Sequence, residues 1–580
     1  MKYIKSFLQK FSWSRLLFSL IFSIALFYMN KIVFLGKVFN ENYMDLVFFN
    51  EFKILLLLVP IIYVLLSFIE NYFNNNSSKF IDKNQNVNIK HFVIITFFFL
   101  LFIYSIYYLT FYPGGVYIDT WTSFKMLNGT EPFSNHQPVL YTLSLGIVNL
   151  FKPDLVTGFG VYSFIQMVIM IAAFTYFIYW LLKKNVNKFL VTLTAFVLGF
   201  FPLFPMYSIS IWKDTPFSLA LFMYILTIID LIIDFSNKNI TIKNIVKLSI
   251  YTSLVVLFRN NGIYITFLCF IALILLFIKP IFKDKSITHI KSFAISQIIT
   301  FIILVIIIKV IYPACGILPT EFEENLGIPL QQIARVVVTD GNITEDQKAI
   351  IEKILPYDRI KKDYQAMLVD NIKWDNQFNA TYIKENKPEF FKLWFELLLQ
   401  NPGEYIKAYL LQTSGFWTFN VKGEEAYTSV EAWGFLNEIV PNTDLIKQTF
   451  NQSFKDTLLR FPYYSAGLFF WITALSAFIT YRTCKPKALL GYLPSMLLWL
   501  TIMVATPMAQ ALRYAYILVL MLPLNFLYPI IMKDLYPRYH LLNDIVSSTI
   551  NKDENKVETK DKDISLSEKE IKTETEKVNN

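Results

Sequence analysis

Apolar runs long enough to cross a lipid bilayer recur along most of this sequence. A helix rises 1.5 Å per residue, so about 20 apolar residues cover the ~30 Å hydrocarbon core of a membrane. Of the 580 residues, 55% are hydrophobic and 17% are charged, whereas soluble domains carry roughly 25% charged residues. We therefore predict an all-α polytopic membrane protein with about a dozen transmembrane helices.

The clearest predicted spans are residues 16–35, 54–68, 92–112, 161–182, 189–207, 216–233, 263–278, 293–311, 465–480, 488–504 and 514–531. A shorter run at 245–258 is expected to make one further span with a polar end. The first run is long and lacks a small-residue cleavage pattern after it, so we expect a retained helix rather than a signal peptide.

The distribution of Lys and Arg predicts the orientation of these spans. With the N-terminus in the cytoplasm, the cytoplasmic loops hold about 20 cations and the opposite short loops about 7. An even number of spans then returns the C-terminus to the cytoplasm. Because the composition is rich in Ile, Phe, Asn and Lys, we expect a bacterial source and the plasma membrane as its location.

The spans and the two long loops predict the domain organisation. The regions are 1–90, two N-terminal helices and a cytoplasmic loop; 91–312, a transmembrane core with a long outer loop at 113–154; 313–462, an extracytoplasmic domain; 463–533, three C-terminal helices; and 534–580, a cytoplasmic tail. The tail mixes Lys with Glu and Asp and has few apolar residues, so we expect it to be disordered.

The extracytoplasmic domain is expected to be mostly helical. Thr344 and Gln347 have the spacing of a capping box, ahead of a helix that ends before Pro356. Asn401 is expected to cap another helix, because a proline follows it in the first turn.

The helix that precedes Asn401 is unusually apolar. It carries Phe390, Phe391, Trp394 and Phe395 within six residues, followed by three leucines. We expect this helix to lie against the bilayer surface.

Asp119 belongs to the first of several polar clusters at the expected outer ends of the spans. Two glycines precede it, which lets the chain turn sharply as it leaves the membrane, and Tyr117 and Trp121 flank it. A catalytic carboxylate and a simple interfacial acid within an aromatic belt are both compatible with this pattern.

His136 and the adjacent pair Lys213–Asp214 form two further clusters. His136 stands in the polar run 134–138, ahead of a short apolar segment at 139–150 that we expect to lie in the interface. Lys213 and Asp214 are too polar to enter hydrocarbon cheaply, so they mark a tight outer turn. Each cluster can be purely structural or can bind a substrate.

The remaining cluster combines two arginines, Arg259 followed by Asn260 and Arg513 followed by Tyr514. The planar guanidinium group suits phosphate because it can donate to two oxygens at once. Either arginine can instead extend to the lipid headgroups without a further role.

These segments, taken in order, resemble the GT-C superfamily of membrane glycosyltransferases, which includes protein O-mannosyltransferases and lipid A aminoarabinose transferases. They are most similar to a group of bacterial multi-pass membrane proteins related to that superfamily. The resemblance covers roughly residues 90–530 and implies a GT-C-like helix arrangement. The first two spans look like an N-terminal addition to it.

The resemblance implies a sugar donor on a polyprenyl phosphate and an extracytoplasmic acceptor, which is a cell-wall or surface polymer, a lipid or a protein. Asp119 matches the expected general base, which removes the acceptor proton. Lys213, Arg259 and Arg513 are the candidates to stabilise the phosphate leaving group.

The other candidates are substrate-binding residues. Asp214 matches a second acid that supports the acceptor or a basic residue, and His136 is expected to bind either substrate. Asn260 and Tyr514 belong to the same matching segments. The extracytoplasmic domain is expected to select the acceptor.

No cofactor is expected, although a divalent metal is not excluded. Asp119 is followed by Thr120, so the adjacent acid pair of some GT-C members is missing, and no cluster offers several oxygen ligands. Cys269, Cys315 and Cys484 are scattered without metal-ligand spacing.

Other classes of function remain as alternatives. A lipid-linked glycan flippase or another transporter would place ionisable residues or broken helices near the bilayer midplane. A non-catalytic membrane scaffold would use the extracytoplasmic domain for binding. Nucleic-acid binding is not expected, because the net charge of +9 comes largely from the cytoplasmic loops.

Overall fold

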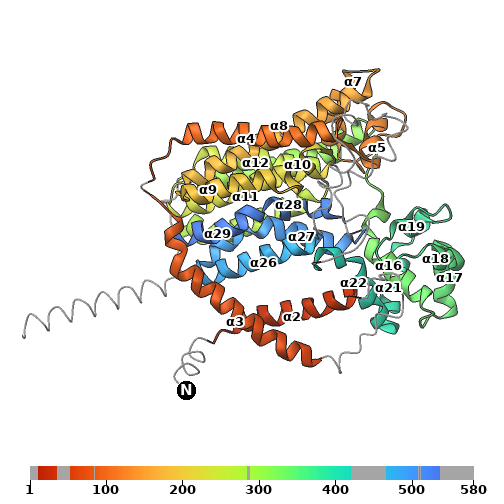
Figure 1. The fold of residues 1–580 in the computed structure, drawn as a ribbon. Coiled ribbons are helices and arrows are strands. Elements are labelled where there is room, and N and C mark those ends of the chain that lie inside the picture. Colours follow the sequence, from red (N-terminus) through yellow and green to blue (C-terminus); the bar gives the residue numbers. More distant parts are fainter. Residues whose placement is uncertain are drawn as a thin grey trace, which may run out of the picture.

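The computed structural model describes residues 11–34, 52–83, 85–283, 288–419, 465–506, 508–509 and 511–535 (Figure 1). The predicted disordered tail lies almost entirely outside the described residues. So do the last part of the predicted extracytoplasmic domain and the lysines of the first ten residues.

A bundle of long helices makes up most of the described chain (Figure 1). Its helices are α2 (Trp13–Phe34), α3 (Phe52–Asn76), α4 (Ile89–Thr110), α8 (Leu155–Lys183), α9 (Lys188–Phe200), α10 (Leu203–Ile209), α11 (Asp214–Ser236), α12 (Ile242–Phe258), α13 (Gly262–Lys283), α14 (Ile290–Ile306), α26 (Ala466–Thr483), α27 (Leu493–Ala505), α28 (Tyr516–Leu520) and α29 (Leu522–Leu535). A helical domain packs at one end of this bundle. We call this end the domain end and the other the opposite end.

Several helices of the bundle are long and apolar enough to cross a membrane. Within the described residues there are 6 such helices, or 7 if the bent pair α9 and α10 makes one span. The pair bends by 52° at Pro202, which has no N–H for the helix ladder. α27 has 13 residues and α12 has 17, so some predicted spans are helices too short to pass the same test.

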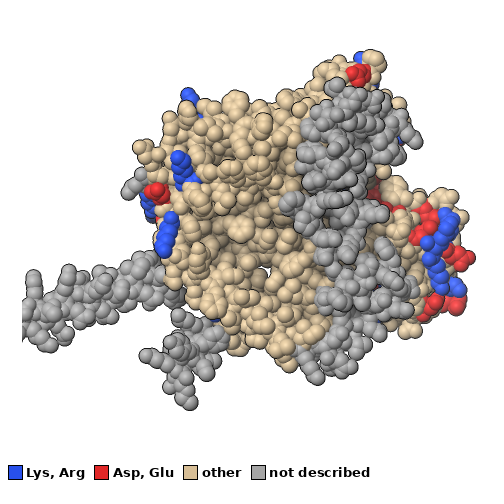
Figure 2. All heavy atoms as spheres, viewed as in Figure 1, with Lys and Arg blue, Asp and Glu red and all other residues tan. Residues whose placement is uncertain are grey.

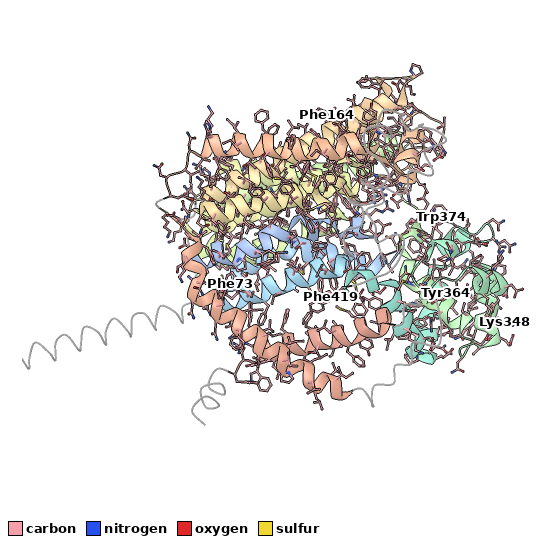
Figure 3. The ribbon with its side chains drawn as sticks, viewed as in Figure 1. Phe73, Phe164, Lys348, Tyr364, Trp374 and Phe419 are labelled. Atoms are coloured by element: carbon pink, nitrogen blue, oxygen red, sulfur yellow. The ribbon has the colours of Figure 1, made fainter. Side chains whose placement is uncertain are left out.

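The outside of the bundle is apolar, as expected for a membrane protein. α4 exposes Ile95, Phe98 and Phe102 by 61–68%, and Phe164 of α8 projects from the bundle surface in Figure 3. On the face drawn in Figure 2, the charged side chains of the described residues gather at the two ends, and the broad zone between them shows none. Soluble proteins rarely expose so large a continuous apolar surface to water.

The helices of the bundle share one hydrophobic core, which α11 crosses. Phe217, Leu221, Ile225 and Ile229 of α11 are completely buried. At the domain end, Tyr207 and Tyr516 stack with ring centroids 4.0 Å apart, which joins α10 to α28. This packing sets the positions of the helix ends that carry the polar clusters.

The helical domain has its own hydrophobic core. It comprises α16 (Gly327–Val338), α17 (Glu345–Ile354), α18 (Tyr357–Asp363), α19 (Asp370–Lys373), α20 (Ala380–Glu385), α21 (Lys387–Gln400) and α22 (Pro402–Gln412). The predicted capping box of Thr344 and Gln347 is present, and the helix that it opens ends before Pro356. The Asn401 side chain does not cap α22 but accepts a hydrogen bond from Asn342 N at 2.8 Å.

The apolar helix predicted to contact the bilayer is α21. Its residues Phe390, Leu393 and Leu397 are buried in the domain core, whereas Phe395 and Leu399 are 53% and 66% exposed. The helix therefore carries more apolar surface than the domain core uses. Its contact with a bilayer stays a prediction.

Short elements cover the domain end of the bundle between α4 and α8. They are β1 (Gly115–Val116), α5 (Ile118–Leu127), α6 (Val139–Ser144) and α7 (Gly146–Asn149). The segment 139–150, predicted to be one interfacial helix, is thus two short helices that meet at Leu145. Gly146 at the break has low helix propensity, which favours an interruption there.

A charged site at the domain end of the bundle

Two short strands position the loop that carries Asp119. β1 pairs in parallel with β2 (Ser210–Ile211), with Gly115 opposite Ser210. Gly114 has a φ of +106°, and a Cβ there would lie 2.7 Å from both Ile209 O and Ser163 Cβ. Only glycine fits this turn. The predicted role of the glycines in turning the chain is therefore confirmed at Gly114.

The strand pairing brings Asp119 beside Lys213. α5 starts one residue after β1 and carries Asp119 in its first turn, while Lys213 lies between β2 and the start of α11. The Thr120 hydroxyl donates to Ile211 O, which holds α5 against β2. Lys213 Nζ lies 3.7 Å from Asp119 Oδ2.

Arg513 reaches the same carboxylate from the other end of the sequence. It stands in the short helix η9 (Leu512–Ala515), and its Nη1 donates to Asp119 Oδ2 at 2.9 Å. Its guanidinium carbon lies 4.8 Å from the ring centroid of Trp212 and 4.9 Å from that of Tyr514. Trp212 in turn stacks on Tyr117 with centroids 3.7 Å apart. Aromatic rings thus hold the arginine beside Asp119.

The two cations change the acidity of Asp119. Burial by itself raises the pKa of this carboxyl, but the positive charges of Lys213 and Arg513 and the hydrogen bond from Arg513 lower it further, so the pKa lies well below the ordinary value of an aspartate. The side chain is 27% exposed. In this state Asp119 is ionised and is a weak proton acceptor.

Asp214 and Arg259 form a second ion pair next to the first. Asp214 Oδ1 lies 2.8 Å from Arg259 Nη1, and the Asp214 side chain is completely buried. The contact is an ion pair without the alignment of a hydrogen bond. Arg259 Nη1 also donates to Tyr514 O at 3.3 Å, and its guanidinium carbon lies 5.1 Å from the Tyr514 ring centroid.

Tyr514 therefore contacts both arginines and joins the two ion pairs into one site. Asp214 and Arg259 balance each other. Asp119 with Lys213 and Arg513 carries one negative and two positive charges, a net charge of +1. The site can attract an anion without a change in the ionisation of any of these residues.

His136 and Asn260 are brought to the same end of the bundle but contact the start of the helical domain. His136 Nδ1 lies 3.2 Å from Glu321 Oε2. Asn260 Nδ2 donates to Asn135 O at 2.6 Å and to Thr320 Oγ1 at 3.1 Å. These residues connect the loop at 134–137 to the chain that enters the helical domain.

Gln137 and Trp212 are site residues that the sequence reasoning did not select. Lys213 Nζ donates to Gln137 Oε1 at 2.7 Å, and Gln137 is 1% exposed. Trp212 is 5% exposed, and its Nε1 has no hydrogen-bond partner in the described part of the chain. Gln137 belongs to the polar run 134–138 and Trp212 directly precedes Lys213, but no spacing rule distinguishes them from their neighbours.

The helical domain also contacts the loop that precedes Arg513. Ala509 N donates to Met367 O at 2.9 Å, and Leu368 forms an isolated bridge with Met508. α19 begins two residues later at Asp370, and the exposed Trp374 follows it on the upper side of the domain in Figure 3. Residues of the helical domain thus lie beside the charged site.

Within the described residues, no group of three or more His, Cys, Asp or Glu side chains could hold a metal ion. The three cysteines are free, with Cys269 and Cys484 buried and Cys315 exposed. The expectation that the protein uses no cofactor stays a prediction.

Fold and site together define a helical membrane protein. A separate helical domain packs at one end of its helix bundle, and a cationic site lies at the same end. The family model described as "Family of unknown function (DUF6020)" matches residues 52–534, so the chain belongs to this family. No curated protein and no solved structure matches the chain.

Proposed function

We propose that this protein is a GT-C-type membrane glycosyltransferase that moves a sugar from a polyprenyl-phosphate donor to an acceptor outside the cell membrane. The observation that carries this proposal is the contact of one carboxylate with two cations, Asp119 with Arg513 at 2.9 Å and Lys213 at 3.7 Å. Transfer from a lipid phosphate needs a base for the acceptor and positive charge for the leaving phosphate.

The proposal includes a place for the protein in the bacterial plasma membrane. The bundle would make about twelve spans, counting its shorter helices, with both termini in the cytoplasm and the helical domain outside. The lysines at the opposite end, among them Lys183, Lys184 and Lys247, would then face the cytoplasm. The charged site would face the outer surface, where a polyprenyl-linked donor and an acceptor can both reach it.

Asp119 is the proposed general base. Its loop position and its 27% exposure leave it accessible to an acceptor hydroxyl or amine. Its low pKa makes it a poor base while both cations contact it, so the base must lose part of this contact before it can act. A phosphate that binds the cations would produce that change.

Lys213 and Arg513 are proposed to stabilise the phosphate as the bond to the anomeric carbon breaks. Arg259 is engaged with the buried Asp214, so this pair is proposed to support Tyr514 and Arg513 rather than to contact the phosphate itself. His136, Asn260 and Tyr514 would border the substrates, and the helical domain beside them would help to select the acceptor. No cofactor is proposed.

The test is a transfer assay in membranes with a mixture of polyprenyl-phosphate sugars. The wild type, Asp119→Asn and Asp154→Asn are compared at matched protein levels. Asp154 is a suitable control, because it is an exposed aspartate that caps α8 and asparagine caps a helix equally well. We expect Asp119→Asn to lose about 10²–10⁴-fold of the rate and Asp154→Asn to retain it.

Full transfer by Asp119→Asn would remove this residue from the mechanism. If the wild type transfers no sugar with any donor and acceptor fraction, the flippase, other-transporter and scaffold alternatives gain support. A flippase would instead move the intact lipid-linked glycan between leaflets, which a fluorescent donor in reconstituted vesicles detects.

A further inference from the structure

We propose that Asp119 occupies the phosphate-binding position of the site in the unliganded protein, and that a bound phosphate displaces it. The ligand is a phosphate group. The narrower form of the inference, in which this phosphate belongs to a prenyl-linked donor, rests on the proposed function. It adds that the same carboxylate first competes with the phosphate and then serves as the base.

The geometry around Asp119 is that of an anion site. One carboxylate oxygen, Oδ2, takes both Arg513 Nη1 at 2.9 Å and Lys213 Nζ at 3.7 Å. Lys213 Nζ also donates to Gln137 Oε1 at 2.7 Å, and the rings of Trp212 and Tyr514 fix the Arg513 guanidinium. The cations are therefore held in place independently of Asp119 and would stay in place if it moved.

A further hydrogen-bond donor, the indole N–H of Trp212, indicates a ligand larger than the carboxylate. Trp212 is buried, contacts Arg513 and stacks on Tyr117, yet its Nε1 has no hydrogen-bond partner among the described residues. A buried indole N–H without a partner is costly, because it has lost its water without replacement. A phosphate has more acceptor oxygens than a carboxylate and can take this N–H as well.

Asp214, the neighbouring acid, does not compete with a phosphate for Lys213 and Arg513. Asp214 is completely buried and faces Arg259 at 2.8 Å, and α11 begins at this residue. Asp119 is partly exposed and stands at the start of α5, close to the glycine turn at Gly114. Of the two carboxylates, Asp119 is the one that can leave its cations without breaking the core.

Displacement has a consequence for the reaction. Without the two cations, the pKa of Asp119 returns toward its ordinary range and the carboxylate becomes a better base. The base would thus become active only when a phosphate occupies the site. This order would keep the protein from activating an acceptor before a donor is present.

The test is anion binding without turnover, measured by calorimetry on the purified full chain in a neutral detergent. The probes are a short-chain prenyl monophosphate, inorganic phosphate and phosphatidylglycerol, each titrated separately into wild type, Asp119→Asn and Asp154→Asn. We expect Asp119→Asn to bind the prenyl monophosphate about tenfold or more tightly than the wild type, because a competing negative charge is removed. Asp154→Asn should bind it as the wild type does.

A second variant tests whether the indole N–H of Trp212 donates a hydrogen bond to the phosphate. Trp212→Phe keeps an aromatic ring, although a smaller one, but removes the N–H, and we expect it to weaken prenyl monophosphate binding by about tenfold, the effect of one hydrogen bond to a charged group. Asp119→Ser serves as a second way to remove the carboxylate, should the asparagine variant fold poorly. Melting temperature and gel-filtration profile establish that each variant is folded.

Unchanged or weaker binding of all three probes by folded Asp119→Asn and Asp119→Ser would overturn the proposal. Tighter binding of the prenyl monophosphate alone would identify the lipid-linked donor, and tighter binding of all three would identify phosphate groups in general. Because no sugar is transferred in this experiment, its result is independent of the transfer assay. Tighter anion binding in a protein that transfers no sugar would keep the phosphate site and support the flippase, other-transporter and scaffold alternatives over the glycosyltransferase.

Discussion

Arg513 and Asp119 lie 394 positions apart in the sequence, and their side chains meet at 2.9 Å. The contact joins the loop between α4 and α8 to the start of the segment that contains α28 and α29. Lys213, between them in the sequence, reaches the same carboxylate oxygen. Three distant segments therefore meet at one carboxylate, and the packing of the helices beneath them holds the site together.

Removal of the Lys213 charge should slow transfer. Lys213→Gln is expected to lower the transfer rate by about 10²-fold, because the leaving phosphate loses a positioned cation. The matched control is Lys348→Gln, since Lys348 lies on the helical domain far from the site (Figure 3). Equal rates for the two variants would show that Lys213 takes no part in the reaction.

The low pKa of Asp119 predicts how its contribution to stability depends on pH. A carboxylate with a depressed pKa in the folded protein stabilises it above the unfolded pKa of about 3.9, and this stabilisation is lost as the pH falls through the folded pKa. Asp119→Asn should therefore melt below the wild type at pH 7. The difference should begin to shrink below about pH 4, where the carboxyl of the unfolded chain takes up a proton while folded Asp119 stays ionised, and it should vanish only as the pH falls through the folded pKa.

Melting curves of the purified wild type and Asp119→Asn, recorded from pH 7 downward in one detergent, check this expectation. Asp154→Asn controls for the general effect of acid on the protein. A difference that stayed constant through this range would contradict a charge-based contribution of Asp119.

The buried pair Asp214–Arg259 should behave as one unit. Arg259→Gln leaves a completely buried carboxylate without its cation, which costs about 3–5 kcal/mol of unfolding free energy. The double variant Arg259→Gln with Asp214→Asn should recover part of that loss. Denaturation of both single variants and the double variant gives the coupling free energy, and simple additivity would argue against a direct interaction.

A second buried cluster, at the opposite end, should affect stability alone. Glu70 lies 2.8 Å from Arg15 and 3.0 Å from Arg482, which ties α2 and α3 to α26. Glu70→Gln removes the carboxylate that faces both arginines, and we expect a loss of about 3–5 kcal/mol. Phosphate binding by the folded variant should equal that of the wild type.

Glu352→Gln, at an exposed position of the helical domain, is the matched control for Glu70→Gln in the same melting experiment. If the two variants melted alike, the cluster at Glu70 would contribute little. A change in phosphate binding by Glu70→Gln would show that the two ends of the bundle are coupled.

Local patterns in the sequence were sufficient for much of the secondary structure. Hydropathy predicted a helical membrane protein, and the capping box at Thr344 and Gln347 predicted a helix start that the structure contains. Such signals act within a few residues, so they survive without knowledge of the fold. Helix length was less predictable, because the bend at Pro202 and the short helix α27 depend on how neighbouring helices pack.

The sequence by itself determined that acids and cations stand at the ends of apolar helices, because charges cannot enter hydrocarbon cheaply. Only the tertiary structure decided which of them meet. Arg513 contacts Asp119 and Arg259 contacts Asp214, although the sequence places Asp214 next to Lys213 and offers no reason to divide the arginines this way. The pairing depends on the packing of helices hundreds of positions apart, which no local spacing records, and for that reason Gln137 and Trp212 also went unrecognised.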